Sequence, residues 1–192
     1  MSLRLTSFLV LVGWISARMA SGPTLGLRES FCGRVYGSPP FIEPAESIGP
    51  LRLRSSLLDL KRSCPGARDT SSLPWGRGFL LTAFGSSIVI VGDQPVLGDT
   101  ADRVVTLIRV SGGTNLRTRD GLSPGSTIGD AKRKWGDLQV TACPAGVSYA
   151  YAPARPGLGL VFAATCTGVQ GEVASYPDSL TIRAIEIFTP VD

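Results

Sequence analysis

The sequence contains no histidine among its 192 residues. Serine and cysteine hydrolases commonly use histidine as the base that activates their nucleophile, so its absence excludes Ser-His-Asp and Cys-His mechanisms together. Lysine is scarce as well, because only Lys61, Lys132 and Lys134 stand against sixteen arginines. A bias this general follows genome composition more often than function, and it indicates no particular partner.

Long apolar segments are also absent, since no stretch reaches the roughly 20 apolar residues that a membrane-spanning helix needs. The apolar run 5–15 follows Arg4 and precedes small residues, which is the layout of a secretory signal. We therefore predict a signal peptide over residues 1–22 and a mature protein exported to the periplasm or the extracellular space. An uncleaved anchor is the alternative, because neither Ala17 nor Ala20 completes a clean A-x-A cleavage site.

No strong charge of either sign marks the chain. Lysine and arginine number 19 against 15 acidic residues, and two of the arginines, Arg4 and Arg18, lie in the predicted signal. The mature chain is nearly neutral, so no nucleic acid and no anionic membrane surface is expected as a partner. The 43% hydrophobic content is enough to build a core in a chain of this length.

Four cysteines in an exported chain predict two disulfides. Three pairings are possible, and we favour the sequential one, Cys32 with Cys64 and Cys143 with Cys166, because it links each half of the chain internally. Zinc is the competing interpretation. The sequence has no C-x-x-C pair and no histidine to complete a ligand set, so no metal and no cofactor is expected.

Two segments, 55–64 and 126–135, resemble each other at an offset of 71 residues. Apolar residues at i, i+3 and i+7 predict that each is a helix of about eight residues with one buried face. A hydroxyl residue followed by Asp three positions later predicts a cap at each start, and Pro or Gly follows each end. The predicted caps are Ser56 with Asp59 and Thr127 with Asp130.

Strand-like segments follow each predicted helix. Short breaks between them, such as 84–86 and 144–146, favour antiparallel hairpins. The sequence therefore predicts an α+β protein of two tandem units, 23–112 and 113–192, each a short helix packed on a three- or four-stranded antiparallel sheet. The predicted strands are 79–83, 87–91 and 103–110 in the first unit, and 138–142, 147–151, 158–162 and 180–188 in the second.

The turn Gly121 to Thr127 has the form G-x-x-x-G-[ST]-[ST] and opens the second helix. With the two helix-plus-sheet units, it makes residues 45–188 resemble the β-lactamase-inhibitor-protein-like superfamily, which includes tandem inhibitors and outer-membrane assembly lipoproteins. The chain also looks like uncharacterised exported bacterial proteins with a T-x-D-G turn. The resemblance implies a concave sheet that holds a protein partner. Arg54 departs from the pattern where the first unit would carry the turn glycine, and Pro65 directly follows the first helix.

Residues 121–125 also fit G-x-S-x-G, the pattern of a hydrolase nucleophile elbow. Ser123 has no histidine to act as its base, and Pro124 has no N–H to complete an oxyanion hole. The same stretch lacks the lysine of a phosphate-binding loop. We therefore expect no catalytic residue here and read the stretch as a turn.

Carboxylates are the remaining catalytic candidates, because a pair of them can hydrolyse a glycoside without histidine. Their spacing matches no carboxylate motif, and the 93–102 loop lacks the D-x-D-x-D-G order of a calcium loop. A carboxylate-dependent envelope hydrolase is therefore the alternative function. The acids concerned are Asp93, Asp99 and Asp102 in that loop, and Glu172, Asp178 and Glu186 near the end.

Three aromatic residues are candidates for contact with a partner. Tyr149 and Tyr151 lie on one face of a predicted strand, where core packing is the competing interpretation, and Trp75 lies in a predicted loop. Trp135 is expected on the inner face of its helix. The leading hypothesis is an exported, non-enzymatic interaction module that binds an envelope or extracellular protein or a surface ligand.

Overall fold

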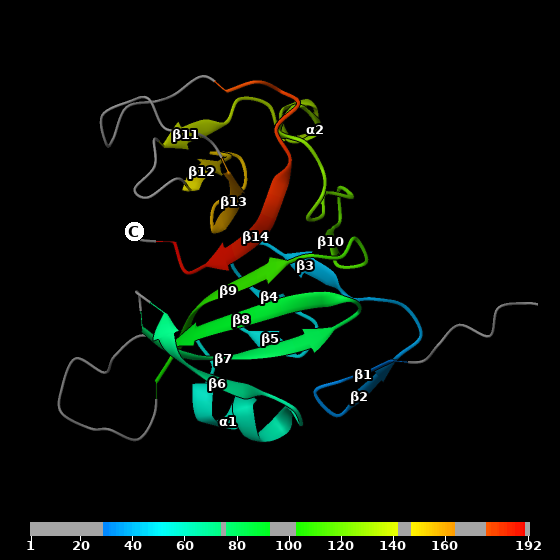
Figure 1. Ribbon diagram of the computed structural model, residues 1–192, viewed down its shortest axis with the longest axis vertical. Helices are drawn as coiled ribbons and strands as arrows, with labels where there is room; N and C mark the ends of the chain where they lie inside the picture. Colours follow the sequence, from blue (N-terminus) through cyan, green and yellow to red (C-terminus); the bar gives the residue numbers. More distant parts are fainter. Residues whose placement is uncertain (1–28, 74–75, 93–102, 142–146, 164–175, 191–192) are drawn as a thin grey trace, which may run out of the picture.

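The computed structural model describes residues 29–73, 76–92, 103–141, 147–163 and 176–190 (Figure 1). Several predicted features lie outside these residues. They are the signal peptide, Trp75, the acids of the 93–102 loop, Cys143, Cys166 and Glu172.

The central element is an eight-stranded sheet in which every pair of neighbours is antiparallel. Its order is β11-β12-β13-β14-β9-β8-β7-β6, so two meanders of four strands meet where β9 pairs with β14. The strands are β6 (Arg68–Leu73), β7 (Gly76–Ala83), β8 (Ser86–Gly92), β9 (Val105–Ser111), β11 (Gln139–Thr141), β12 (Val147–Tyr151), β13 (Leu158–Ala163) and β14 (Ile182–Phe188).

Two short helices accompany the meanders. Helix α1 (Leu57–Ser63) precedes β6 to β9 in the chain, and α2 (Ile128–Trp135) precedes β11 to β14. The predicted α+β class is confirmed. The sequence predicts a separate sheet for each half, whereas the structure has one continuous sheet (Figure 1). The two meanders form one sheet because the last strand of each would otherwise have an unpaired edge, and these two edges hydrogen-bond to each other.

A second group of short strands is not predicted from the sequence. Because each has only two or three residues, and prolines and glycines separate them, none shows a readable alternation. Strand β10 pairs in parallel with β3 and so links residues 117–118 to residues 41–42. The strands are β1 (Glu29–Phe31), β2 (Arg34–Tyr36), β3 (Phe41–Glu43), β4 (Ser47–Ile48), β5 (Leu51–Arg52) and β10 (Arg117–Thr118).

One face of the large sheet forms the core together with the short strands and both helices. Ile90, Ile108 and Ile187 lie opposite one another on β8, β9 and β14, and each is 0% exposed. The short strands contribute Ile42, Ile48 and Leu51 to the same cluster, and the helices contribute Leu60, Ile128, Ala131 and Trp135. Helices this short are marginal alone, so this burial is what holds them.

Both helices begin at a capped hydroxyl residue. Ser56 Oγ accepts from the backbone N–H of Asp59 at 3.0 Å. At α2 the bonds are reciprocal: Thr127 Oγ1 accepts from the Asp130 N–H at 3.1 Å, and Asp130 Oδ2 accepts from the Thr127 N–H at 2.9 Å. The backbone N–H of Thr127 favours the ionised carboxylate and lowers the pKa of Asp130.

The predicted disulfide between Cys32 and Cys64 is present. Cys32 lies in the turn between β1 and β2, and Cys64 caps the C-terminal end of α1. The bond therefore ties the first described hairpin to the first helix. Phe31 beside it is buried and contacts Phe84 edge-on at 5.6 Å between ring centroids.

Candidate functional site

The turn that resembles a nucleophile elbow is bound into the fold by its backbone. Ser123 donates its backbone N–H to Ser126 Oγ at 3.1 Å, and Gly125 donates its N–H to the carbonyl of Ile182 at 2.8 Å. Asp120, which is not predicted from the sequence as a site residue, accepts from Trp135 Nε1 at 2.9 Å and from Arg155 at 2.8 Å. These contacts join the turn to β14, α2 and the β12–β13 connection, which is a structural role.

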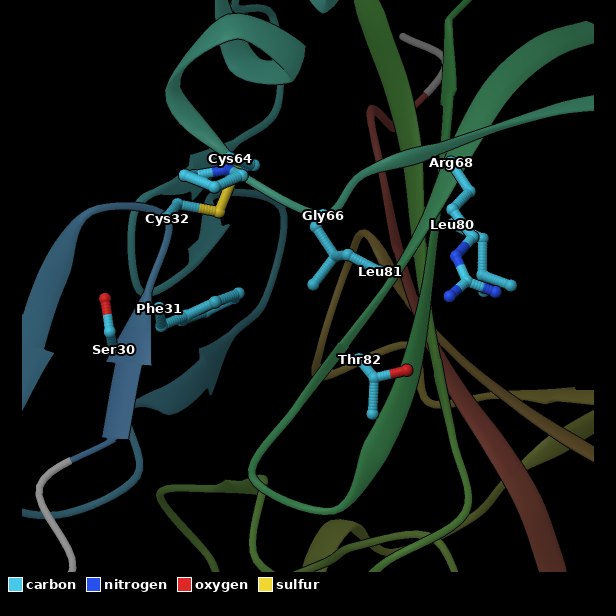
Figure 2. Close-up of a pocket in the computed structure, with 10 residues that line it drawn as sticks. Ser30, Phe31, Cys32, Cys64, Gly66, Arg68, Leu80, Leu81 and Thr82 are labelled. Atoms are coloured by element: carbon cyan, nitrogen blue, oxygen red, sulfur yellow. A yellow bond between two sulfur atoms is a disulfide. The ribbon is translucent and has the colours of Figure 1, made fainter.

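A cavity of about 260 Å³ lies beside the disulfide (Figure 2). Figure 2 shows Leu81 pointing toward the disulfide, with Arg68 and Leu80 lying beyond the strand from it. The cavity offers the hydroxyls of Ser30 and Thr82, but no carboxylate or other base lies among the described residues that line it. Its chemistry therefore does not form a nucleophilic site.

The second face of the large sheet carries a continuous group of side chains that does not belong to the core. Alternate residues of a strand point to opposite faces, and residues directly paired across strands point to the same face. The paired residues that alternate with the core residues therefore share this second face. We call it the outer face. It is formed by Leu80, Val89, Leu107, Arg109, Tyr149, Tyr151, Glu186 and Phe188, none of which belongs to the core cluster.

Three aromatic rings stand in a row on the outer face. The rings of Tyr149 and Tyr151 are parallel within 9°, with centroids 6.5 Å apart, and Phe188 meets Tyr151 edge-on at 5.8 Å. Gly159 separates β12 from β14 on this face and leaves space for Tyr151 and Phe188 to approach each other. All three rings are half-buried, so they present area to solvent as well as to one another.

An ion pair between Arg109 and Glu186 lies beside these rings, at the middle of the sheet. The side chains are 21% and 5% exposed, and the guanidinium also reaches the Tyr149 hydroxyl at 3.4 Å. Burial raises the pKa of Glu186 above its ordinary value, although Arg109 acts in the opposite direction. Burial also raises the pKa of Tyr151, with smaller contributions from Glu186 and Tyr149.

The buried carboxyl makes stability depend on pH. The folded-state pKa of Glu186 is raised, so the folded protein holds this proton more tightly than the unfolded chain does. The resulting contribution to the free energy of unfolding is fully present below the ordinary carboxyl pKa and is lost as pH rises through the folded-state pKa. Glu186→Gln removes this titration and keeps an oxygen that accepts from Arg109. We expect the unfolding midpoint of the parent to fall relative to that of Glu186→Gln as pH rises above the ordinary Glu pKa of about 4.3, measured by urea titration at several pH values. Parallel profiles would contradict the assignment.

The structure brings Tyr149 and Tyr151 together on one face of a strand, as the sequence predicts. Trp135 lies in the core at 7% exposure. Phe188 and Arg109 are not predicted as site residues from the sequence, and Glu186 is predicted only as a candidate catalytic acid. The sequence signal for these residues is weak. Alternation along strands 105–111 and 182–188 shows which residues share a face within each strand, but it does not show that the two strands pair.

The described carboxylates give little support for paired-acid chemistry. Glu186 is paired with Arg109, and Asp178 is paired with Lys132 at 2.5 Å. Among the described residues, no group of three or more His, Cys, Asp or Glu side chains could hold a metal ion. The site is therefore best described as an aromatic surface around a central ion pair.

No helix among the described residues is long and apolar enough to cross a bilayer. No protein-family model matches the chain. No curated protein matches it either. Among solved structures, it is similar to the uncharacterized protein yfeY from Escherichia coli, with 16% identity and a TM-score of 0.47 over 76% of this chain and 98% of that one. A similarity at this level carries no information about activity.

Proposed function

We propose that this protein is an exported, non-enzymatic interaction module that binds a protein partner on the outer face of its sheet. The observation that carries the proposal is the row of Tyr149, Tyr151 and Phe188 beside the Arg109–Glu186 pair. Tyrosine and arginine are enriched among the residues that dominate binding energy, and a rigid sheet holds them with little entropy to lose. The disulfide supports export, because such bonds persist in oxidising compartments.

The proposal includes the two tandem units predicted from the sequence. The loop before each helix bonds to the last strand of its own meander through equivalent backbone groups. Arg54 and Gly125 donate to the carbonyls of Val105 and Ile182, both at 2.8 Å; Val105 and Ile182 donate back to the carbonyls of Ser55 and Ser126 at 2.9 and 2.7 Å. The loops are related by the offset of 71 and the strands by an offset of 77, so the repeat extends beyond sequence similarity.

The turn residue that departs from the expected pattern also supports a repeat. Gly125 has φ +97°, and Arg54 at the equivalent place has φ +62°. Both therefore lie in the left-handed region, which is unfavourable for a residue with a side chain. A shared backbone conformation maintained at that cost is consistent with duplication. We keep the resemblance to the β-lactamase-inhibitor-protein-like superfamily within this proposal, since it implies the same use of a two-unit sheet.

Truncating the two tyrosines tests the proposed binding face. A partner is first captured from an envelope fraction on the immobilised mature protein, and its Kd is then measured for each variant. Because a dominant interface residue contributes about 2 kcal/mol or more, Tyr149→Ala and Tyr151→Ala are each expected to weaken binding about 30-fold.

Phe41→Ala is the matched control, because Phe41 is 44% exposed but lies on β3, outside the large sheet. It is expected to bind as the parent does. Equal binding by all three variants would reject the outer face as the contact surface. Capture of no partner, together with turnover of a glycan by the parent, would favour the carboxylate-dependent hydrolase instead.

A further inference from the structure

The Arg109–Glu186 pair occupies a special position in the junction between the two meanders. The two residues lie directly opposite each other where β9 pairs with β14. They are also 77 residues apart, which is the offset that relates the two strands in the proposed duplication. Each is therefore the other's counterpart, and the junction has an approximate two-fold axis through the pair. This step rests on the tandem units proposed above.

The core residues on either side of the pair do not distinguish the two strands. Ile108 and Val110 flank Arg109, and their counterparts Ile185 and Ile187 flank Glu186. All four are 0% exposed. Because these apolar neighbours are nearly the same on both strands, β9 could bury the same kind of surface against a second β9 as it does against β14. Apolar burial thus supplies affinity at the junction but little choice of partner.

The two charges do distinguish the strands. In a β9–β9 pair with the same register, Arg109 would face Arg109, and in a β14–β14 pair Glu186 would face Glu186. Like charges directly opposite each other destabilise a strand pair. A buried charge that has lost its opposite partner destabilises the fold strongly, because its desolvation is no longer offset by attraction. A polar residue at one otherwise apolar contact is a known means of selecting among competing pairings.

We propose that the Arg109–Glu186 pair determines which sheet edges join. It admits a β9 edge to a β14 edge, of the same chain or of a second copy, and rejects pairing between two identical edges. The apolar residues around it then close the sheet.

Charge reversal in the full-length mature chain tests this selection. Arg109→Glu places two carboxylates at the junction, and Glu186→Arg places two guanidinium groups there. Each single variant is expected to lose at least about a hundredfold in its folding equilibrium, because a buried charge is left facing a like charge. Arg109→Glu/Glu186→Arg restores an opposite pair and is expected to refold as a monomer.

Mixing the two single variants gives the sharper result. When they are refolded together under oxidising conditions, an exchanged heterodimer contains two junctions of opposite charge. The substituted β9 of the Arg109→Glu chain pairs with the substituted β14 of the Glu186→Arg chain, and the two unsubstituted strands, which keep Arg109 and Glu186, pair with each other. We expect native mass spectrometry of differently tagged chains to show this heterodimer in excess over either homodimer. Refolding the mixture also keeps the test decisive if each single variant fails to fold alone.

An exposed ion pair provides the control. Lys132 and Asp178 form a pair whose side chains are 40% and 65% exposed, so Lys132→Glu and Asp178→Lys are expected to keep the oligomeric state of the parent and to form no heterodimer when mixed. Two outcomes would overturn the proposal: no rescue by the double reversal, or no heterodimer from the Arg109→Glu and Glu186→Arg mixture. Neither measurement involves a binding partner, so a negative result with the tyrosine variants would leave it standing.

Discussion

Replacing both Cys32 and Cys64 by serine is expected to lower the free energy of unfolding by about 3–4 kcal/mol. The two cysteines are 32 residues apart, and the bond between them restricts the unfolded chain over that distance. It also fastens a hairpin of two three-residue strands, which alone is too small to be stable in water. A loss of this size is a large fraction of the roughly 5–15 kcal/mol that stabilises an ordinary domain.

Urea denaturation of the oxidised parent and of the double serine variant measures this loss. Limited proteolysis adds a local readout, because cleavage within residues 29–40 should become faster in the variant than cleavage within the large sheet. Single Ser63→Ala serves as the control, since Ser63 adjoins Cys64 and, among the described residues, its hydroxyl bonds to the Leu60 carbonyl at 2.9 Å and contacts the Cys64 sulfur. An unchanged midpoint in the double serine variant would contradict the role given to the bond.

Local features of this fold could be read from the sequence because local physics determines them. The helices α1 and α2 follow from their apolar spacing, and their starts follow from hydroxyl residues placed three positions before an Asp. The long strands β8, β9 and β14 follow from runs of β-branched residues bounded by turns. In each case the pattern that identifies the element lies within the element and the residues that bound it.

Features that depend on distant partners could not be read in this way. The union of the two meanders depends on β9 and β14 recognising each other across more than 70 residues, and no periodicity within either strand indicates its neighbour. The strands from β1 to β5 are too short to show a pattern, and β10 is strand-like only because β3 lies beside it.

The candidate site divides along the same line. Tyr149 and Tyr151 are two residues apart on one strand, so their shared face was predictable. Phe188 and Arg109 join them only through the pairing of β12, β13, β14 and β9 in sequence across the sheet. Glu186 looked like an isolated acid because its partner lies 77 positions away.

Gly157→Ala is expected to be the second severe change, because this residue joins the short strands to the large sheet. Its carbonyl accepts from Ala45 at 3.4 Å and from Phe188 at 3.0 Å. A Cβ atom here would lie 2.5 Å from the Ala45 Cβ and 2.7 Å from the Phe188 carbonyl oxygen. Both contacts are with atoms close to or within the backbone, so they cannot be relieved by turning a flexible side chain.

The conformation of Gly157 adds to this steric cost, and a second glycine allows the two to be separated. Gly157 has φ +76° and Gly136 has φ +79°, but a Cβ at Gly136 meets nothing within 4 Å. Gly136→Ala therefore measures the cost of a positive φ alone, about 1–3 kcal/mol at its ψ of −148°. Gly157→Ala carries that cost together with overpacking and is expected to lose about 3–4 kcal/mol.

The same two variants test whether the packing around Gly157 affects the proposed binding face. Overpacking at Gly157 pushes against the backbone of Phe188, which carries the third ring of the aromatic row. Gly157→Ala is therefore expected to weaken partner binding even under conditions where the variant is fully folded, whereas Gly136→Ala should bind as the parent does.

Equal losses of stability in the two variants would mean that the short strands shift away from the sheet at little cost. Parent-like binding by folded Gly157→Ala would show instead that the partner does not depend on the position of Phe188.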